Sequence, residues 1–353
     1  MTGRRRNGKM ACVGAGFVAL DVVRPEWRDG SELRFAGGSC GNVLTILSFL
    51  GWKSSVVARI GHDLAGRQLA GDLERWSVDT HMLIREESAR TPVVFQRIFN
   101  DRDGHRRHSF SRYCAVCGEW AVPYRPVRLR DADAASAGLP TAEVFYFDRV
   151  APGNLELARR AHAAGALVVF EPSGVKDPRL FLECLRLTHV FKYSHARFDS
   201  HAAMVSEALV PIVVETRGEE GLRVTVRRKG RVVLSEDMVA LPAPRLADAA
   251  GSGDWCTAGL IHRIVGGRIS VDRISDAGEV IVHALRYAQA LAAINCAFEG
   301  ARGVMYRMSK EKLMRGAAAL AEGRHLKLPN GTDERTVAGP QEGTICVVCD
   351  RSL

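Results

Sequence analysis

Asp248-Ala249-Ala250-Gly251-Ser252-Gly253-Asp254 is the stretch that decides most about this chain, and it stands between a strand-like apolar stretch and the apolar run 255–261. Gly251 and Gly253 would leave backbone N–H groups uncovered where a helix begins. Such a helix start carries partial positive charge and free donors, which suits an anion. Asp254 would lie in the first turn, able to take a proton from a hydroxyl while the amides hold a moving phosphoryl group. Because paired glycines also occur in ordinary turns, the motif alone leaves both interpretations open.

The composition is that of an ordinary globular protein. The chain has 353 residues, of which 46% are hydrophobic and 25% charged, enough for one large α/β domain or two smaller ones. No uncharged apolar run approaches the roughly 18 residues that a membrane helix requires, so no membrane partner is expected. Three arginines at 4–6 precede an apolar stretch, but Gly14, Gly16 and Asp21 interrupt it, so we expect a basic tail, a first strand and a cytoplasmic protein.

The formal net charge is +9 at pH 7. A basic balance suits nucleic acid, an acidic partner or phosphate-bearing ligands, and it also describes an ordinary solvated surface. The arginines are spread along the chain, without a basic block interleaved with aromatic residues. Nucleic acid is therefore not the expected partner, and a basic nucleic-acid binder is only a third hypothesis.

Strand-like apolar runs alternate with helical patterns along the chain. The expected strands are 10–18, 54–59, 143–147, 167–171 and 210–215, and the expected helices are 42–50, 65–76, 155–164 and 281–298. This alternation predicts a parallel sheet with helices on both faces. In such sheets, ligands bind beyond the carboxyl ends of the strands.

Two stretches break the alternation. Residues 18–34 and 92–110 carry strand patterns with turn chemistry between them, at Asp29-Gly30 and at 101–104. They predict a small sheet beside the main body, either a flap that covers a site and excludes water or a pair of surface hairpins. The globular pattern ends near residue 328, and the polar stretch that follows predicts a linker.

A second motif, Gly37-Gly38-Ser39-Cys40-Gly41-Asn42, precedes an apolar helix. Paired glycines let the backbone approach a ligand closely, and Asn42 adds a donor and an acceptor. Together with the heptapeptide about 200 residues later, this pattern resembles the PfkB, or ribokinase-like, family of carbohydrate and nucleoside kinases, over roughly residues 10–325.

That resemblance implies a fold and its divisions. The expected architecture is a three-layer α/β/α ribokinase-like fold with a mostly parallel central sheet and a small β-sheet lid. We expect a basic tail at 1–9, a kinase domain at 10–328, and a linker with a cysteine-bearing tail at 329–353. The lid is expected from about 18–36 and 90–112.

The resemblance also implies roles for single residues. Asp254 matches the catalytic base, and its anion hole would consist of Gly251, Ser252 and Gly253, with serine where alanine is more usual. Residues that match substrate contacts are Asp21, Gly37, Gly38, Asn42 and Arg106. The matching nucleotide loop carries Thr216, Gly218 and Gly221. Asp21 and Arg106 could equally be surface residues. Gly218 and Gly221 could serve merely to shape a hairpin, with no role in nucleotide binding. Asp148, which ends a strand at the expected carboxyl edge, is a further candidate for the substrate site.

One position departs from the family pattern. The family carries Asn-x-x-Glu, which organises magnesium and phosphate through water, where this chain has Ser194 and Arg197. A cation in place of a metal-linked carboxylate inverts the local charge. Either Arg197 binds phosphate directly, or magnesium is positioned less well and turnover is slow.

The resulting hypothesis is an ATP-dependent kinase that phosphorylates a hydroxymethyl group of a sugar or nucleoside, with sugar slightly favoured. ATP, Mg²⁺ and a monovalent cation are the implied cofactors. The second hypothesis, which Ser194 and Arg197 motivate, is a catalytically weak or inactive family member that acts as a small-molecule-binding regulator or scaffold. Exposed lid strands favour a homodimer.

Nine cysteines are many for such a protein. Five lie singly in apolar surroundings and are expected to be core residues. The others form two Cys-x-x-Cys pairs at Cys114, Cys117, Cys346 and Cys349. Two such pairs can supply the four thiolates of a structural zinc site, and a reducing cytoplasm favours metal over disulfide. Coincidence, a redox pair and a site that bridges two chains are the alternatives, and the family resemblance does not include zinc.

Overall fold

The computed structural model describes residues 9–27, 32–136, 141–198, 202–267, 269–328 and 345–350. Residues 1–8 of the expected basic tail, the Asp29-Gly30 turn and the linker at 329–342 lie outside the described residues.

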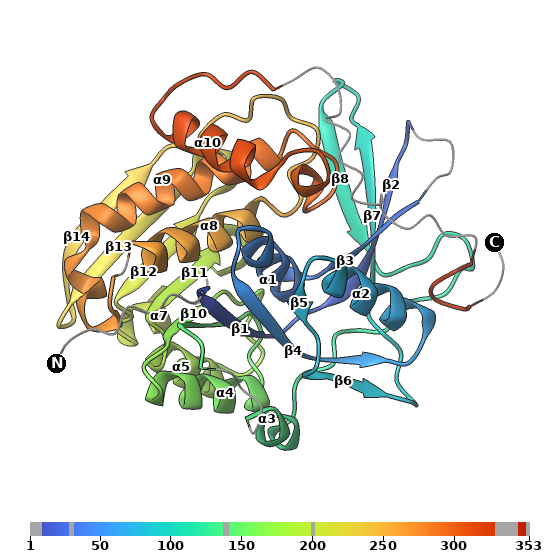
Figure 1. Cartoon of the computed structure of the whole chain (residues 1–353), viewed down its shortest axis with the longest axis horizontal. Helices are drawn as coiled ribbons and strands as arrows, with labels where there is room; N and C mark the ends of the chain where they lie inside the picture. The colour runs from blue at the N-terminus through green and yellow to red at the C-terminus, as the bar shows by residue number, and fades with distance from the viewer. Residues whose placement is uncertain are drawn as a thin grey trace.

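A mostly parallel central sheet forms the middle layer (Figure 1). Its parallel strands, in spatial order, are β12 (Ile212–Thr216), β11 (Val190–Ser194), β10 (Leu167–Phe170), β9 (Val144–Phe147), β1 (Ala11–Ala15), β4 (Lys53–Gly61) and β5 (Val78–Asp79), with β6 (Leu83–Glu86) also paired to β4. At one edge the antiparallel strands β13 (Leu222–Arg228) and β14 (Arg231–Met238) extend the sheet. Several of the inner strands are buried along their whole length, as expected for strands covered on both faces.

Helices cover both faces of this sheet (Figure 1). One layer contains α1 (Ser39–Phe49), α2 (Leu64–Arg75), α8 (Ser252–Gly266), α9 (Gly278–Asn295) and α10 (Lys310–Ala321). The other contains α3 (Leu129–Ser136), α4 (Pro152–Ala163), α5 (Pro178–Arg186), α6 (His195–Phe198) and α7 (Ala202–Glu207). Each layer buries its own hydrophobic cluster against the sheet. The three-layer α/β/α prediction is confirmed.

A separate four-stranded sheet forms the lid, in the order β3 (Leu33–Gly37), β2 (Ala19–Pro25), β7 (Val93–Asn100) and β8 (Arg106–Ser111). β2 and β7 run parallel, whereas the two outer pairs are antiparallel.

The expected strand at 10–18 is wrong in one respect, because β1 ends at Ala15 and the chain turns at Gly16. A Cβ on Gly16 would collide with the buried carboxylate of Asp148, so only glycine fits there.

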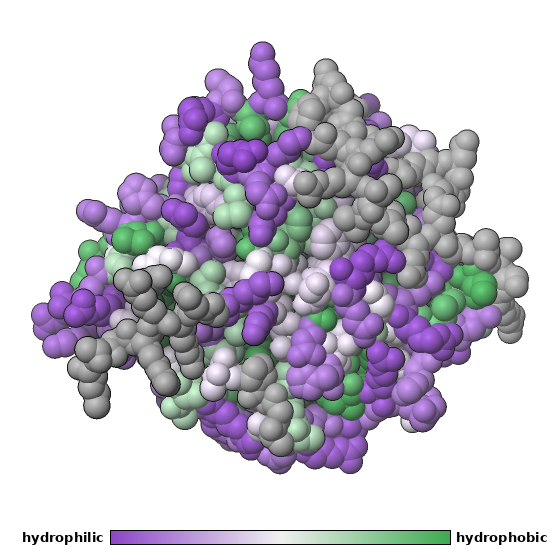
Figure 2. Space-filling model, viewed as in Figure 1, coloured by the Kyte–Doolittle hydropathy of each residue, from purple (hydrophilic) through white to green (hydrophobic). Residues whose placement is uncertain are grey.

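The surface in the view of Figure 2 is mostly hydrophilic, with hydrophobic residues scattered among the hydrophilic ones. Among the described residues, no helix has the length and apolar character needed to cross a membrane.

Candidate active site

The heptapeptide forms the turn into α8. Gly251 caps this helix with φ 73°, a left-handed conformation, and a Cβ on it would collide with the Ala301 carbonyl. Both facts require glycine at this position. Ser252, Gly253 and Asp254 make up the first turn, whose amides have no partner within the helix, although Ser252 N donates a long 3.3 Å hydrogen bond to the Ala249 carbonyl before it. The predicted anion-binding geometry is therefore available at the start of α8.

Asp254 is half-buried, and the side chain of Asn42 on α1 donates a 2.8 Å hydrogen bond to its Oδ2. Burial raises the pKa of Asp254 to about 8, and the nearby Glu171 carboxylate adds to this, while Asn42 and Lys192 oppose it. A carboxyl group whose pKa lies near neutral pH is suited to accept a proton during a reaction. The structure thus joins Asp254 and Asn42, which the sequence placed in separate motifs.

Lys192 and Glu171 lie beneath the turn and were not predicted as site residues. Lys192 on β11 is almost completely buried and forms an ion pair with Glu171, which directly follows β10. Lys192 Nζ also donates to the Gly253 carbonyl at 3.3 Å, and Thr257 on α8 donates to the second oxygen of Glu171. Burial alone would lower the pKa of Lys192, but Glu171 raises it above its usual range. The signal in the sequence was a lysine inside an apolar strand, which requires a buried partner.

Asp21 and the paired glycines meet at the entry to α1. Gly38 caps α1 with φ 77°, and a Cβ on Gly37 would collide with the Asp21 carboxylate. Burial raises the pKa of Asp21 to about 7, against the attraction of Arg302. The two glycines therefore let an acidic side chain from the lid lie against the start of the helix that carries Asn42.

Asp148 has a different set of contacts from the predicted one. It is fully buried, Phe17 N donates to its Oδ1 at 2.8 Å, and Cys40 N donates to its Oδ2 at 3.1 Å. Arg149 lies 3.2 Å from the same Oδ2. These contacts fix the turn after β1 and the start of α1, so Asp148 has a positioning role, and its contact with substrate stays a prediction.

The lid contacts the heptapeptide directly. Gln96 on β7 donates a 2.6 Å hydrogen bond to Asp248 Oδ2, and His108 on β8 lies 3.0 Å from Asp248 Oδ1. Asp248 Oδ2 also accepts from Gly300 N at 2.9 Å. The buried carboxylate of Asp248 thus connects the lid strands β7 and β8 to the turn before α8.

Arg106 belongs to the same face of the lid as His108, because side chains two apart on a strand share a face. Its guanidinium lies 3.5 Å over the ring of Trp27, and the Trp27 Nε1 donates to Glu299 at 2.9 Å. Among the described residues, Arg106 Nη1 and Asn42 Oδ1 are buried without a hydrogen-bond partner. A polar ligand would satisfy such atoms, which supports the predicted roles of both residues.

The predicted nucleotide loop follows β12. Thr216 donates from Oγ1 to the Tyr193 carbonyl at 3.1 Å, and Gly218 begins a short 3₁₀ helix (Gly218–Glu220). Gly221 has φ 109°, and a Cβ on it would collide with the carbonyl of Met238, so the hairpin alone already requires this glycine. Arg197 lies exposed on α6, close to the end of β11. The roles of these four residues in nucleotide binding stay predictions.

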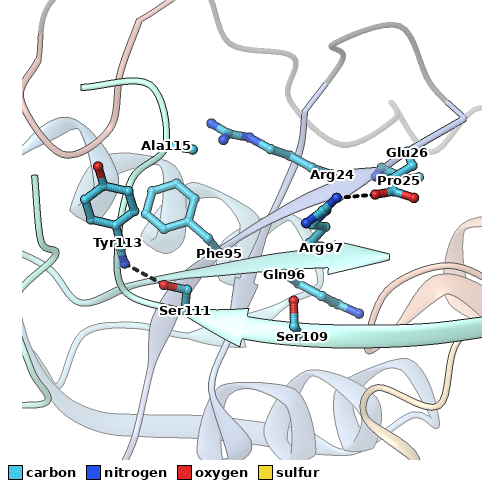
Figure 3. A pocket seen from close by; sticks show the side chains of 10 residues that line it. All are labelled: Arg24, Pro25, Glu26, Phe95, Gln96, Arg97, Ser109, Ser111, Tyr113 and Ala115. Carbon is cyan, nitrogen blue, oxygen red and sulfur yellow. Dashed lines mark hydrogen bonds and ion pairs between the residues drawn. The ribbon is translucent and has the colours of Figure 1, made fainter. Parts of the chain in front are cut away.

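A hollow of about 450 Å³ lies on the opposite face of the lid (Figure 3). Phe95, Gln96 and Arg97 of β7 all border the hollow, and the side chain of Gln96 extends from it to Asp248 on the other face of the lid. Tyr113 and Ala115, from the first cysteine pair's segment, complete its wall, and Asp254 is not among the lining residues. This hollow is therefore distinct from the candidate active site.

Comparisons with known proteins agree with the architecture. Residues 16–121 match the family model described as pfkB family carbohydrate kinase. The chain is 23% identical over 331 residues to the probable fructokinase-2 of Arabidopsis thaliana, covering 85% of this chain and 94% of the relative. It is 24% identical over 239 residues to a nucleoside kinase of Methanothermobacter thermautotrophicus, covering 65% of this chain and 72% of the relative.

Solved structures match over nearly the whole chain. The fructokinase with bound ATP from Xylella fastidiosa superposes with a TM-score of 0.64 at 19% identity, covering 89% of this chain and 98% of that one. The Burkholderia thailandensis nucleoside kinase in complex with inosine gives a TM-score of 0.64 at 17% identity, covering 89% and 99%. The fold is that of the ribokinase-like kinases. The chain therefore resembles the PfkB-family kinases, as its two sequence motifs predicted.

Proposed function

We propose that this protein is an ATP-dependent kinase that transfers a phosphoryl group to a hydroxymethyl group of a sugar or nucleoside. The observation that carries the proposal is the position of Asp254, which lies in the first turn of α8 beside the backbone amides of that turn and accepts a hydrogen bond from Asn42. The similar proteins support the substrate class, since their names describe fructokinases and nucleoside kinases.

In this mechanism, Asp254 takes the proton of the attacking hydroxyl, and Asn42 holds the carboxylate in place. The amides at the start of α8 stabilise the charge on the transferring phosphoryl oxygens. Asp21 and Arg106 orient the acceptor from the lid side, and the lid excludes water. The proposal is supported by the positions of these residues, since Asp254 lies in the first turn of α8, while Asp21 and Arg106 lie on the lid strands β2 and β8.

Magnesium would neutralise negative charge on the phosphates of ATP, and Mg²⁺ in proteins generally retains several water ligands. Glu171 is the carboxylate that fits a water-linked contact with such an ion, because it lies beside the Gly253 turn and is held by Lys192 and Thr257. Arg197, a cation on the exposed side of α6, does not fit as a metal ligand. The proposal therefore assigns the organising carboxylate to Glu171. The monovalent cation, the homodimer and the cytoplasmic location stay predictions.

The test is a screen of ADP release with ATP across hexoses, pentoses, their phosphates and purine and pyrimidine nucleosides. We expect one acceptor class to give acceptor-dependent ADP release, with the product phosphorylated at a hydroxymethyl oxygen by NMR. Protein carrying Asp254→Asn serves as the blank for contaminating kinases. If ATP binds but no acceptor is phosphorylated, the proposal fails and the regulator or scaffold hypothesis takes its place.

Gln96→Leu is expected to weaken lid closure. A hydrogen bond to a charged group contributes about 1.5–3 kcal/mol, so kcat/KM for the acceptor should fall by about 10- to 100-fold. The KM for ATP should change little. Initial rates with varied acceptor measure the effect, and Arg97→Ala, on the opposite face of the lid, is the control. An unchanged kcat/KM in Gln96→Leu, or an equal loss in the control, contradicts the role of the Gln96–Asp248 contact.

A further inference from the structure

The two Cys-x-x-Cys pairs come together although 232 residues separate their first cysteines. The Sγ atoms of Cys114 and Cys346 are 3.7 Å apart, and those of Cys346 and Cys117 are 3.5 Å apart. Cys349 completes the group, since its thiol lies within hydrogen-bonding reach of Cys117. The Sγ atoms of Cys114, Cys117 and Cys346 all lie within 4.8 Å of one another, and Cys349 lies beside this group next to Cys117.

Their spacing matches a metal site and not a disulfide. A disulfide requires about 2.05 Å between sulfurs, far less than the distances here. Four sulfurs at about 2.3 Å from a central Zn²⁺ form a tetrahedron with edges of about 3.8 Å. The observed distances of 3.5 and 3.7 Å are close to those edges.

Both pairs also have the same backbone turn. The amide of Gly118 donates to the Cys114 carbonyl at 2.9 Å, and the amide of Asp350 donates to the Cys346 carbonyl at 2.9 Å. Gly118 has φ 74° and Asp350 has φ 57°, so the residue after each pair is left-handed. Asp350 accepts this conformation without being glycine, at a cost on the order of 1 kcal/mol. Two unrelated segments thus form the same turn and face each other.

The C-terminal pair is held against the lid by further contacts. Arg34 on β3 donates to the Ile345 carbonyl at 2.7 Å, and Arg90, before β7, donates to the Val348 carbonyl and lies 3.6 Å from Asp350. Val347 is buried in the hydrophobic cluster that includes the lid strands.

We propose that Cys114, Cys117, Cys346 and Cys349 bind one Zn²⁺ in a closed structural site. Four thiolates leave no position open for water or substrate, so the ion is structural and not catalytic. The first pair follows β8, while the second contacts β3 and the segment before β7. The ion would therefore link the C-terminal segment at 345–350 to the segment that follows lid strand β8. This inference is independent of the proposed kinase activity.

The test is metal analysis of the full-length protein purified without chelators. We expect about one zinc per chain by mass spectrometry. Cys346→Ser should lose this zinc, whereas Cys184→Ser, which alters a buried thiol in the other hydrophobic cluster, should keep it. Iron in place of zinc, absence of metal, or equal zinc in both variants would overturn the proposal.

A second measurement on the unmodified protein covers the case in which Cys346→Ser does not fold. Titration with an organomercurial should release one zinc as four thiols react, and Co²⁺ exchanged into the site should give the visible absorption of tetrahedral thiolate coordination. Release of zinc with only two or three thiols, or a Co²⁺ spectrum of octahedral type, contradicts the four-thiolate site.

Discussion

Asp254→Asn is expected to lower kcat by about 10²- to 10⁴-fold, the usual contribution of a general base, with ATP affinity nearly unchanged. Asparagine has the same shape and can still accept the hydrogen bond from Asn42, so the turn before α8 should persist. Acceptor-dependent ADP release and ATP titration by calorimetry measure the two quantities. Asp272→Asn, at an exposed carboxylate of a 3₁₀ helix (Val271–Asp276), is the matched control. Full activity of Asp254→Asn would refute the assignment.

The pH dependence of the reaction follows from the raised pKa of Asp254, which is about 8. Only the unprotonated carboxylate can accept a proton, so kcat/KM of the unchanged protein should rise as the pH increases toward 8 and level off above it. The residual activity of Asp254→Asn should lack this rise.

The contribution of Asp254 to the stability of the folded protein should fall as the pH rises, whereas activity should increase. The pKa of Asp254 is raised from an ordinary value of 3.8, so the folded state holds this proton more tightly than the unfolded state. The contribution of Asp254 to stability is therefore lost as the pH rises from about 4 to about 8. Asp254→Asn should raise the melting temperature at pH 8 relative to the unchanged protein, with a smaller difference at pH 4. An inactive variant that is also less stable at pH 8 would point to misfolding instead of a lost base.

The fold was predictable because its signals are local. Inner strands such as β9 and β10 are apolar throughout, and Gly38 and Gly251 each have a positive φ at a helix start, which is a local reason for glycine. The small lid sheet was also predictable, because its strand patterns interrupt the regular alternation.

The less predictable parts of the site depend on contacts between distant segments. Lys192 meets Glu171 only because β10 and β11 are neighbours in the sheet, and Gln96 reaches Asp248 across 152 residues. The sequence could place Asp148 at the edge of the sheet where the parallel strands end. It could not show that the backbone amides of Phe17 and Cys40 donate to its carboxylate, because these contacts depend on how three segments pack. Periodicity in one segment carries no information about such partners.

Lys192→Met is expected to lower the free energy of unfolding by about 3–5 kcal/mol, the cost of breaking a buried pair by removing one partner. The side chain of Lys192 is 2% exposed and that of Glu171 is 17% exposed, so the carboxylate left behind is poorly solvated. Urea denaturation measures the loss. Arg159→Met is the control, because the Arg159–Glu183 pair is about half exposed and such pairs contribute only about 0.2–1 kcal/mol.

The double variant Lys192→Met with Glu171→Gln should recover part of this stability, since it leaves no unpaired charge. It should not recover activity. Lys192 also donates to the Gly253 carbonyl, and this bond orients the turn whose amides would hold the phosphoryl group. A double variant that regains both stability and turnover would show that the pair only supports the fold. Stability regained without turnover would show that the Lys192–Glu171 pair also acts in the reaction, through the Gly253 turn or through the carboxylate of Glu171.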